Sequence, residues 1–406
     1  MRLRNWILIL FFLSMGLGLV PAGAQETDEA ASEEKETKEL KFAGTPYVYT
    51  GPDTGAGAGF AIMYRDMFGK EGRDTSLSLS YTENLYQDYS IDWQEPYFLS
   101  QNGRLKLGLS YSTRPALRFF GFGNEASRYD VCNWASTTYD ITPAYVYRWP
   151  KTSVGVFGLR GQLNMMYSDP DNGRLDNKDA GNFNRKIRDI FPDLYRSEDF
   201  EPSYLIAPQI TVYRDTRSDR FPLGGGREEV VWPMKGGYEE FSYSRYDKAI
   251  GSDFSYNGFS LDVRRFFPII WDDTILALRG KVSVTQGNVP FYQLPSFTGR
   301  GYYGMRFIDK NATEFNVELR QGFLPNAVLP LFNGLITLKY PSICVYWEEG
   351  RVYDDYTEIG DNLFEDYHWV YGWGFRFVVT PSIVIRFDWG FSAEQTTFYM
   401  TAGLPF

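Results

Sequence analysis

The feature that most constrains this chain is an alternation of apolar residues with polar residues or glycine in one segment after another. Residues 105–111, 315–320 and 383–391 all show it. A period of two residues is that of a β-strand, and it places the apolar side chains of such a segment on one face. Turn-forming residues separate the alternating segments from about residue 55 onwards. The pattern therefore predicts an all-β protein.

A soluble β-sandwich and a membrane β-barrel would both alternate, and the second face of the strands distinguishes them. In this chain the second face carries charges and glycine, and tyrosine and tryptophan gather near the strand ends. Aromatic residues make up 18% of the chain, yet its mean hydropathy is −0.35. A transmembrane antiparallel β-barrel with an apolar outer surface and a polar lumen explains both values. Barrel closure also satisfies the backbone hydrogen bonds, as lipid requires.

The chain divides into three parts. Residues 1–24 have the charged start, apolar core and small-residue cleavage site of a secretory signal peptide, with a retained helical anchor as the alternative. Residues 25–44 are an acidic tail for which we expect disorder. Residues 45–406 remain for the barrel. At roughly 20–24 residues for a strand with its connection, we expect 16 strands.

Two segments interrupt the alternation. Residues 168–202 are polar, with a short helix expected over residues 184–191, and residues 215–240 contain three consecutive glycines. Long loops lie on the outer side of bacterial barrels, so we place both segments there. We interpret the glycine-rich residues 55–60 as the first strand, where glycine would weaken pairing. The family resemblance given below implies that this strand can open beside the last one, and the alternative is that it packs tightly against a short tail.

Few residues are suited to site chemistry. The chain has one His and two Cys, and it contains no serine-nucleophile, phosphate-loop or zinc motif. His368 belongs to an aromatic cluster at a strand end, and we interpret it as an interfacial residue. A solvated acidic loop is favoured over an ion site at residues 354–361, and pairing of Cys132 with Cys344 is left open. We expect no enzyme activity, no catalytic residue, no cofactor and no metal site.

The last segment, residues 398–406, is a further alternating strand. Its alternation predicts that the apolar side chains, including Phe398 and Phe406, share one face. A chain that ends on an aromatic residue within such a strand resembles the recognition signal of bacterial outer-membrane barrels. We assign Phe398, Gly403 and Phe406 to this terminal signal.

Several motifs together carry a resemblance to a known family. They lie, in order, at residues 215–222, 260–268, 299–302, 316–320, 346–350, 372–376 and 386–390. In this order and spacing they resemble the BamA/TamA superfamily of outer-membrane barrels, also called the bacterial surface antigen family. The motif at residues 299–302 resembles the Arg-Gly-Tyr signature of the family's long sixth loop, called loop 6 below.

The resemblance implies that loop 6 folds into the lumen and that Arg300 pairs with Glu348, a site where the family has Asp. Gly299 and Gly301 would permit the unusual backbone, and Tyr302 would pack against the inner wall. From the residues alone, Arg300 would be an exposed loop residue. Alternation places a further set of side chains in the lumen: Cys344, Tyr346, Glu348, Gly350, Glu318, Arg320, Arg386 and Asp388.

The resemblance also suggests a function, namely insertion or translocation of proteins or lipids at the bacterial outer membrane. No room remains for the family's periplasmic POTRA domains, so a periplasmic partner protein would supply their function. Other expected partners are outer-membrane lipid and the barrel assembly machinery that inserts this protein. The net charge of −10 argues against nucleic acid. The alternatives are a passive or gated pore, a scaffolding barrel, or a surface adhesin that uses residues 168–202.

Overall fold

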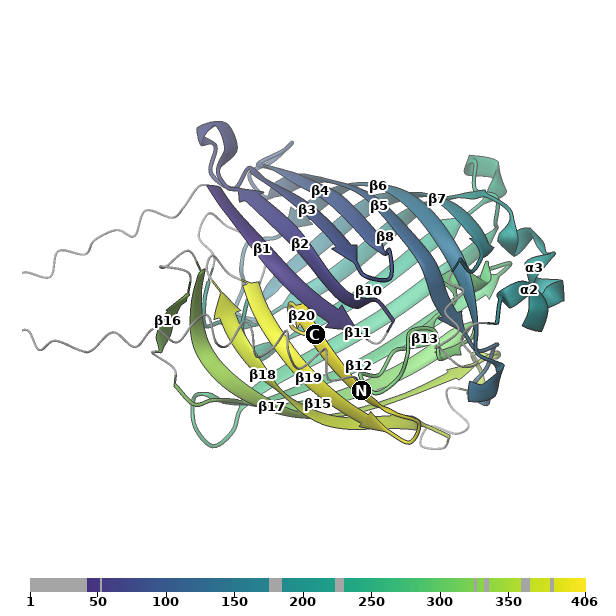
Figure 1. Ribbon diagram of the computed structural model, residues 1–406. Coiled ribbons are helices and arrows are strands. Elements are labelled where there is room, and N and C mark those ends of the chain that lie inside the picture. Colours follow the sequence, from purple (N-terminus) through teal and green to yellow (C-terminus); the bar gives the residue numbers. More distant parts are fainter. Residues whose placement is uncertain are drawn as a thin grey trace, which may run out of the picture.

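A computed structural model describes residues 42–51, 53–174, 185–222, 230–324, 327–331, 336–358, 366–379 and 383–406. Antiparallel strands, 16 in number, form one closed β-barrel (Figure 1), as predicted. The expected signal peptide and most of the acidic tail lie outside the described residues. The first strand begins at Phe42, so residues 42–44, assigned to the tail, belong to the barrel.

The barrel strands follow one another in chain order. The first eight are β1 (Phe42–Gly51), β2 (Gly55–Tyr64), β3 (Asp74–Thr82), β4 (Gln87–Pro96), β5 (Gly103–Phe119), β6 (Cys132–Arg148), β7 (Val156–Asn172) and β8 (Ser203–Asp215). The others are β10 (Pro233–Tyr246), β11 (Tyr256–Pro268), β12 (Thr274–Gly287), β15 (Asn311–Gly322), β17 (Ile336–Tyr353), β18 (His368–Val379), β19 (Ile383–Ser392) and β20 (Thr396–Ala402).

Shorter elements lie in the connections. The short strands are β9 (Ser218–Asp219) beside β10, β16 (Val328–Leu331) beside β17, and the separate pair β13 (Ser296–Phe297) and β14 (Phe307–Ile308). The helices are α2 (Ile187–Ile190), α3 (Pro192–Tyr195), η1 (Met67–Gly69), η2 (Arg128–Asp130), η4 (Glu198–Phe200), η5 (Lys248–Ile250) and η6 (Phe291–Gln293). In the described part of the chain, no helix has the length and apolar character needed to cross a membrane.

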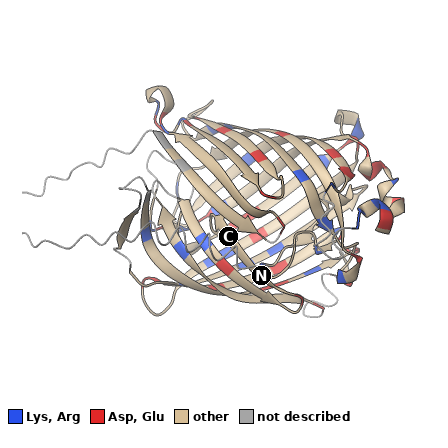
Figure 2. Cartoon of the chain, in the orientation of Figure 1, with Lys and Arg blue, Asp and Glu red and all other residues tan. Residues whose placement is uncertain are grey.

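Side chains alternate between the two faces of the barrel wall. In β17, Val345 and Trp347 are 49% and 41% exposed on the outer surface, whereas Cys344, Tyr346 and Glu348 are at most 5% exposed on the inner one. The apolar residues thus face lipid, and the polar ones face the lumen. Figure 2 shows basic and acidic residues interspersed along the strands.

Successive connections lie at opposite ends of the barrel because consecutive strands are antiparallel. The two longest, residues 173–202 and 288–310, share the end that we call the outer end. The first contains α2 inside the expected helix, and the second contains β13; both elements lie at the right in Figure 1. The end of β8 and the start of β10 lie at the opposite, inner end, so the placement of both interrupting segments on the outer side is wrong for residues 215–240.

The glycine-rich segment is β2 and not the first strand, because β1 precedes it. Tyr49 of β1 lies across Gly57 and donates a hydrogen bond to Ser80 Oγ of β3 at 3.2 Å. A Cβ atom at Gly57 would lie 2.6 Å from the Tyr49 ring. The same arrangement recurs with Tyr47, Gly59 and Ser78. The glycines therefore make room for two rings that tie three strands together.

The barrel closes between β1 and β20 through very little pairing. Every residue of β1 has a partner in β2, and every residue of β20 has one in β19. Between β1 and β20, only Thr50 and Met400 are register partners. We call this junction the seam, and it is the weakest strand pairing between neighbours around the described barrel.

The chain leaves the last strand before its final residue. β20 ends at Ala402, and Gly403 has a φ of 84°, a left-handed conformation that redirects the backbone. Phe406 turns into the lumen, where it is 6% exposed. There it packs with Phe266, Ile275 and Ala277. The prediction that Phe398 and Phe406 share a face is therefore wrong, because the alternation stops at Ala402.

Candidate functional site

Loop 6, residues 288–310, folds back from the outer end into the lumen. Phe297, Tyr302 and Phe307 are at most 3% exposed and form an apolar cluster with inner-wall residues such as Tyr346 and Val370. Burial of three aromatic side chains supplies a large apolar contact area. The loop therefore occupies the lumen as a packed plug.

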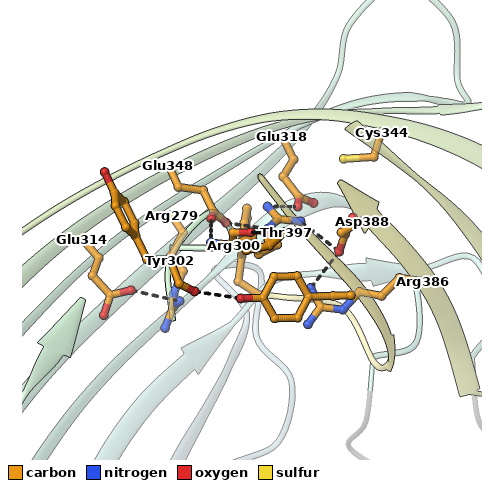
Figure 3. A network of polar contacts seen from close by, with 12 residues as sticks. Arg279, Arg300, Tyr302, Glu314, Glu318, Cys344, Glu348, Arg386, Asp388 and Thr397 are labelled. Atoms are coloured by element: carbon orange, nitrogen blue, oxygen red, sulfur yellow. Dashed lines mark hydrogen bonds and ion pairs between the residues drawn. The ribbon is translucent and has the colours of Figure 1, made fainter. Parts of the chain in front are cut away.

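Arg300 lies at the centre of this plug, with its side chain 8% exposed (Figure 3). Its Nε donates to Glu348 Oε1 at 2.7 Å, and its backbone N–H donates to Oε2 of the same carboxylate at 2.7 Å. Its Nη2 lies 2.6 Å from Glu318 Oε1, and its Nη1 lies 3.4 Å from Asp388 Oδ2. The guanidinium carbon is 3.5 Å from the centre of the Tyr346 ring.

Three further arginines complete the network. Arg320 Nε donates to Glu318 at 2.8 Å, and Arg376 Nη1 donates to Asp388 at 2.6 Å. Arg386 Nη1 donates to the same aspartate at 3.3 Å. Buried charges are stable only when they are paired and hydrogen-bonded. Four guanidinium groups and three carboxylates therefore hold one another, and they fix loop 6 against β15, β17 and β19.

Burial disfavours the charged form of Arg300, but the carboxylates of Glu348, Glu318 and Asp388 outweigh it. They hold the pKa of this loop residue well above the ordinary arginine value. Arg300 therefore stays charged at every physiological pH.

Glycines create the space for the loop backbone. A Cβ atom at Gly301 would lie 2.9 Å from Val370 Cγ1, and one at Gly299 would lie 2.6 Å from the Phe297 ring. A Cβ atom at Gly350 in β17 would overlap the same ring, and one at Gly390 in β19 would overlap the carbonyl oxygen of Arg300. These close approaches explain why glycine occupies the positions.

The structure brings most of the sequence-predicted residues together. Gly299, Arg300, Gly301, Glu348, Gly350, Glu318, Arg320, Arg386 and Asp388 all belong to the network or to the glycines around it. Tyr302 packs beside them, and its hydroxyl donates to the Trp369 carbonyl at 3.4 Å. Of the terminal residues, Phe406 approaches the network, because the Arg320 guanidinium lies 5.2 Å from its ring. Phe398 and Gly403 lie apart from it.

The sequence placed Tyr346 in the lumen without assigning it a contact, and it gave no role to Arg376 or Thr397. Arg376 and Tyr346 stand at lumen-facing positions inside two quoted motifs, so the alternation was a sufficient signal for both. Thr397 donates a hydrogen bond to the Arg300 carbonyl. No local pattern marks this threonine, because its partner lies 97 residues away.

The other singled-out residues are structural. His368 faces inward, where its ring stacks on Phe307 at 3.6 Å and its Nε2 lies 2.9 Å from the Asn124 carbonyl oxygen. The interfacial interpretation is wrong, since loop 6 covers this face of β18. Cys132 and Cys344 are both buried and free. In the described residues, no group of three His, Cys, Asp or Glu could hold a metal ion.

Comparison with known proteins places this geometry in context. The Omp85 superfamily domain matches residues 68–406. BamA from Haemophilus ducreyi lacking POTRA domains 1–3 superposes with a TM-score of 0.57 and 13% sequence identity, over 89% of this chain and 70% of that one. No curated protein matches the chain significantly in sequence.

Two further solved structures are similar. CdiB from Escherichia coli has a TM-score of 0.59 and 11% identity, over 90% of this chain and 63% of that one. CdiB from Acinetobacter baumannii has a TM-score of 0.53 and 14% identity, over 88% and 59%. At these identities the likeness concerns the fold, and the chain spans less than two thirds of either CdiB chain.

Proposed function

Because the chain belongs to the Omp85 superfamily of outer-membrane transport and assembly barrels, we propose that it inserts or translocates proteins or lipids at the bacterial outer membrane. The observation that carries the proposal is the seam, where Thr50 and Met400 are the only register partners between β1 and β20. An outer-membrane client must leave or enter the barrel sideways, and the seam is the place where the wall opens at least cost.

The physical reason lies in backbone hydrogen bonding. Each backbone hydrogen bond contributes about 0.5–1.5 kcal/mol net, and unsatisfied backbone groups are costlier in lipid. Opening any fully paired junction would break a long ladder, whereas opening the seam breaks a short one. The freed strand edge could then pair with an incoming strand.

A disulfide across the seam tests the proposal. Thr50 and Met400 pair on the outward face, so T50C/M400C should lock the junction when oxidised. Ile91 and Leu109, outward-facing register partners in β4 and β5, provide a matched control as I91C/L109C. The assay follows the folding of an unfolded outer-membrane barrel protein into liposomes that contain each variant.

We expect the reduced seam variant to accelerate folding, the oxidised one to lose the acceleration, and a reductant to restore it. The control variant should accelerate folding in both redox states. Equal acceleration by the locked and unlocked seam would exclude lateral opening as the mechanism. Absence of acceleration in every state would refute the insertion role.

The alternatives from the sequence predict other results. A pore would give steady, large single-channel steps from the purified protein in bilayers. We expect no such steps, because loop 6 packs inside the lumen. For the connection 173–202, packing of α2 residue Ile187 against Phe291 of loop 6 favours a cap on the outer end over an adhesin.

We also propose a periplasmic partner at the inner end. Three inner-end turns expose large apolar side chains, namely Phe68, Leu99 and Trp271, which are 77%, 83% and 66% exposed. Such tips offer contact area to a folded protein domain. A partner that co-purifies with the wild-type barrel, and is lost when these three residues become serine, would support the proposal. Unchanged co-purification would contradict it.

A further inference from the structure

Loop 6 binds the β20 side of the seam through its backbone. The Tyr399 hydroxyl in β20 donates to the Tyr302 carbonyl oxygen at 2.9 Å. The Thr397 hydroxyl in the same strand donates to the Arg300 carbonyl oxygen. Both side chains point into the lumen, so β20 is held from inside the barrel.

The loop also holds the turn that leads into β20. Arg306 Nη2 and Nε lie 2.6 and 2.8 Å from the two carboxylate oxygens of Glu394, between β19 and β20. The Arg306 side chain is 5% exposed, and its guanidinium lies 4.3 Å from the centre of the Phe307 ring. A bidentate, largely buried pair of this kind has a defined geometry.

On the other side of the seam, the loop reaches the connection between β1 and β2. The Gly304 N–H donates to Asp53 Oδ2 at 2.9 Å. Arg118 of β5 pairs with the other oxygen of this carboxylate, and its guanidinium lies 3.6 Å from the centre of the Tyr303 ring. Asp53 therefore joins loop 6 to the connection next to β1, and Arg118 joins it to β5.

Residues 300–306 thus bridge the seam from within, whereas the strand ladder across it consists of a single register pair. We propose that these residues are a clasp that keeps the seam closed and that Asp53 is its attachment point on the β1 side. The inference rests on the proposed function and adds the element that regulates it. A client or partner that opens the seam must first release the clasp.

The clasp is distinct from the Arg300 network. That network binds the loop to β15, β17 and β19, on one side of the seam only. The Gly304–Asp53 hydrogen bond reaches the connection that joins β1 to β2, whereas the Arg118–Tyr303 contact reaches β5. The Tyr47 and Tyr49 ties make β1 move with β2 and β3. Loss of Asp53 should therefore free the seam while the loop stays anchored.

Spin labels on T50C/M400C measure the seam directly. They face lipid on the two seam strands, and the native cysteines are buried. Dipolar coupling between the labels gives the ratio of separated to adjacent strands. Because D53A removes a charge-assisted contact, this ratio should rise roughly tenfold. In the matched control D88A, which breaks an ion pair with Arg114 in β5, the ratio should stay at the wild-type value.

A second variant keeps the test decisive. Y399F removes one hydroxyl and keeps the ring, so the barrel should fold and the ratio should rise roughly fivefold, even if D53A reduces folding. If folded D53A and Y399F both show the wild-type ratio of separated to adjacent strands, the clasp proposal is wrong, whatever the protein inserts. If the ratio of separated to adjacent strands rises but no variant accelerates insertion in the liposome assay, the clasp proposal is kept and the proposed function is refuted.

Discussion

Replacing Arg300 by methionine should detach loop 6 from the barrel wall. The structure indicates which of the buried carboxylates would lose its charged partner. Glu318 would keep Arg320, and Asp388 would keep Arg376. Glu348 would keep only the backbone N–H of residue 300. The penalty of an unpaired buried charge, about 3–5 kcal/mol, should therefore arise mainly at Glu348.

The same reasoning fixes the rank of the related variants. In E348Q, Arg300 keeps Glu318 and Asp388, so we expect a loss of about 1–2 kcal/mol. In R300M/E348Q the unpaired carboxylate of residue 348 is absent. The double variant should therefore be about 2 kcal/mol more stable than the sum of the two single losses predicts, and this difference is the coupling energy of the pair. The charge swap R300E/E348R should not recover stability, because it would place a carboxylate against Glu318 and Asp388.

Amide hydrogen exchange of residues 299–306 measures this detachment, and β3 and β4 serve as internal references. A loss of about 3 kcal/mol corresponds to roughly a hundredfold faster exchange. Additive effects of R300M and E348Q, within about 0.5 kcal/mol, would show that the pair does not act as a unit. Wild-type exchange in the swap variant would show that Glu318 and Asp388 do not contribute.

Two further predictions concern the lumen packing. G350A should detach the loop by about 1–3 kcal/mol, because its Cβ atom would overlap Phe297, whereas G161A meets no atom within 4 Å and should exchange like wild type. Equal exchange in both would refute the packing argument. Cys132 and Cys344 should resist a maleimide in the folded barrel, and both should react after denaturation without reductant; two unreactive thiols after denaturation would instead indicate a disulfide.

Much of the barrel was predictable from the chain, because alternation has a period that local sequence records. The lumen positions of Glu318, Glu348 and Asp388 follow from counting in twos from lipid-facing neighbours. The ends of the barrel were less predictable. Taking residues 55–60 as the first strand omits β1, and an error of one strand reverses the end at which a connection lies. The segment 215–240 was placed on the outer side because of its length, whereas the direction of β8 and β10 puts their connection at the inner end.

Other features depend on contacts that no local pattern encodes. Gly304 and Asp53 are 251 positions apart, and neither belongs to a motif. The turn of Phe406 into the lumen depends on one backbone angle at Gly403. The glycines of β2 look like a weakness until Tyr47 and Tyr49 of the neighbouring strand are placed across them.

The tyrosine–glycine ties have a consequence for how this chain can change in evolution. A side chain at residue 57 would displace the Tyr49 ring, and a smaller residue at 49 would leave the space beside Gly57 unfilled. Neither position can drift alone, so the two should covary among related sequences. Because the same holds for Tyr47 and Gly59, the inward-facing tyrosines of β1 should change only together with the glycines of β2 that they cover.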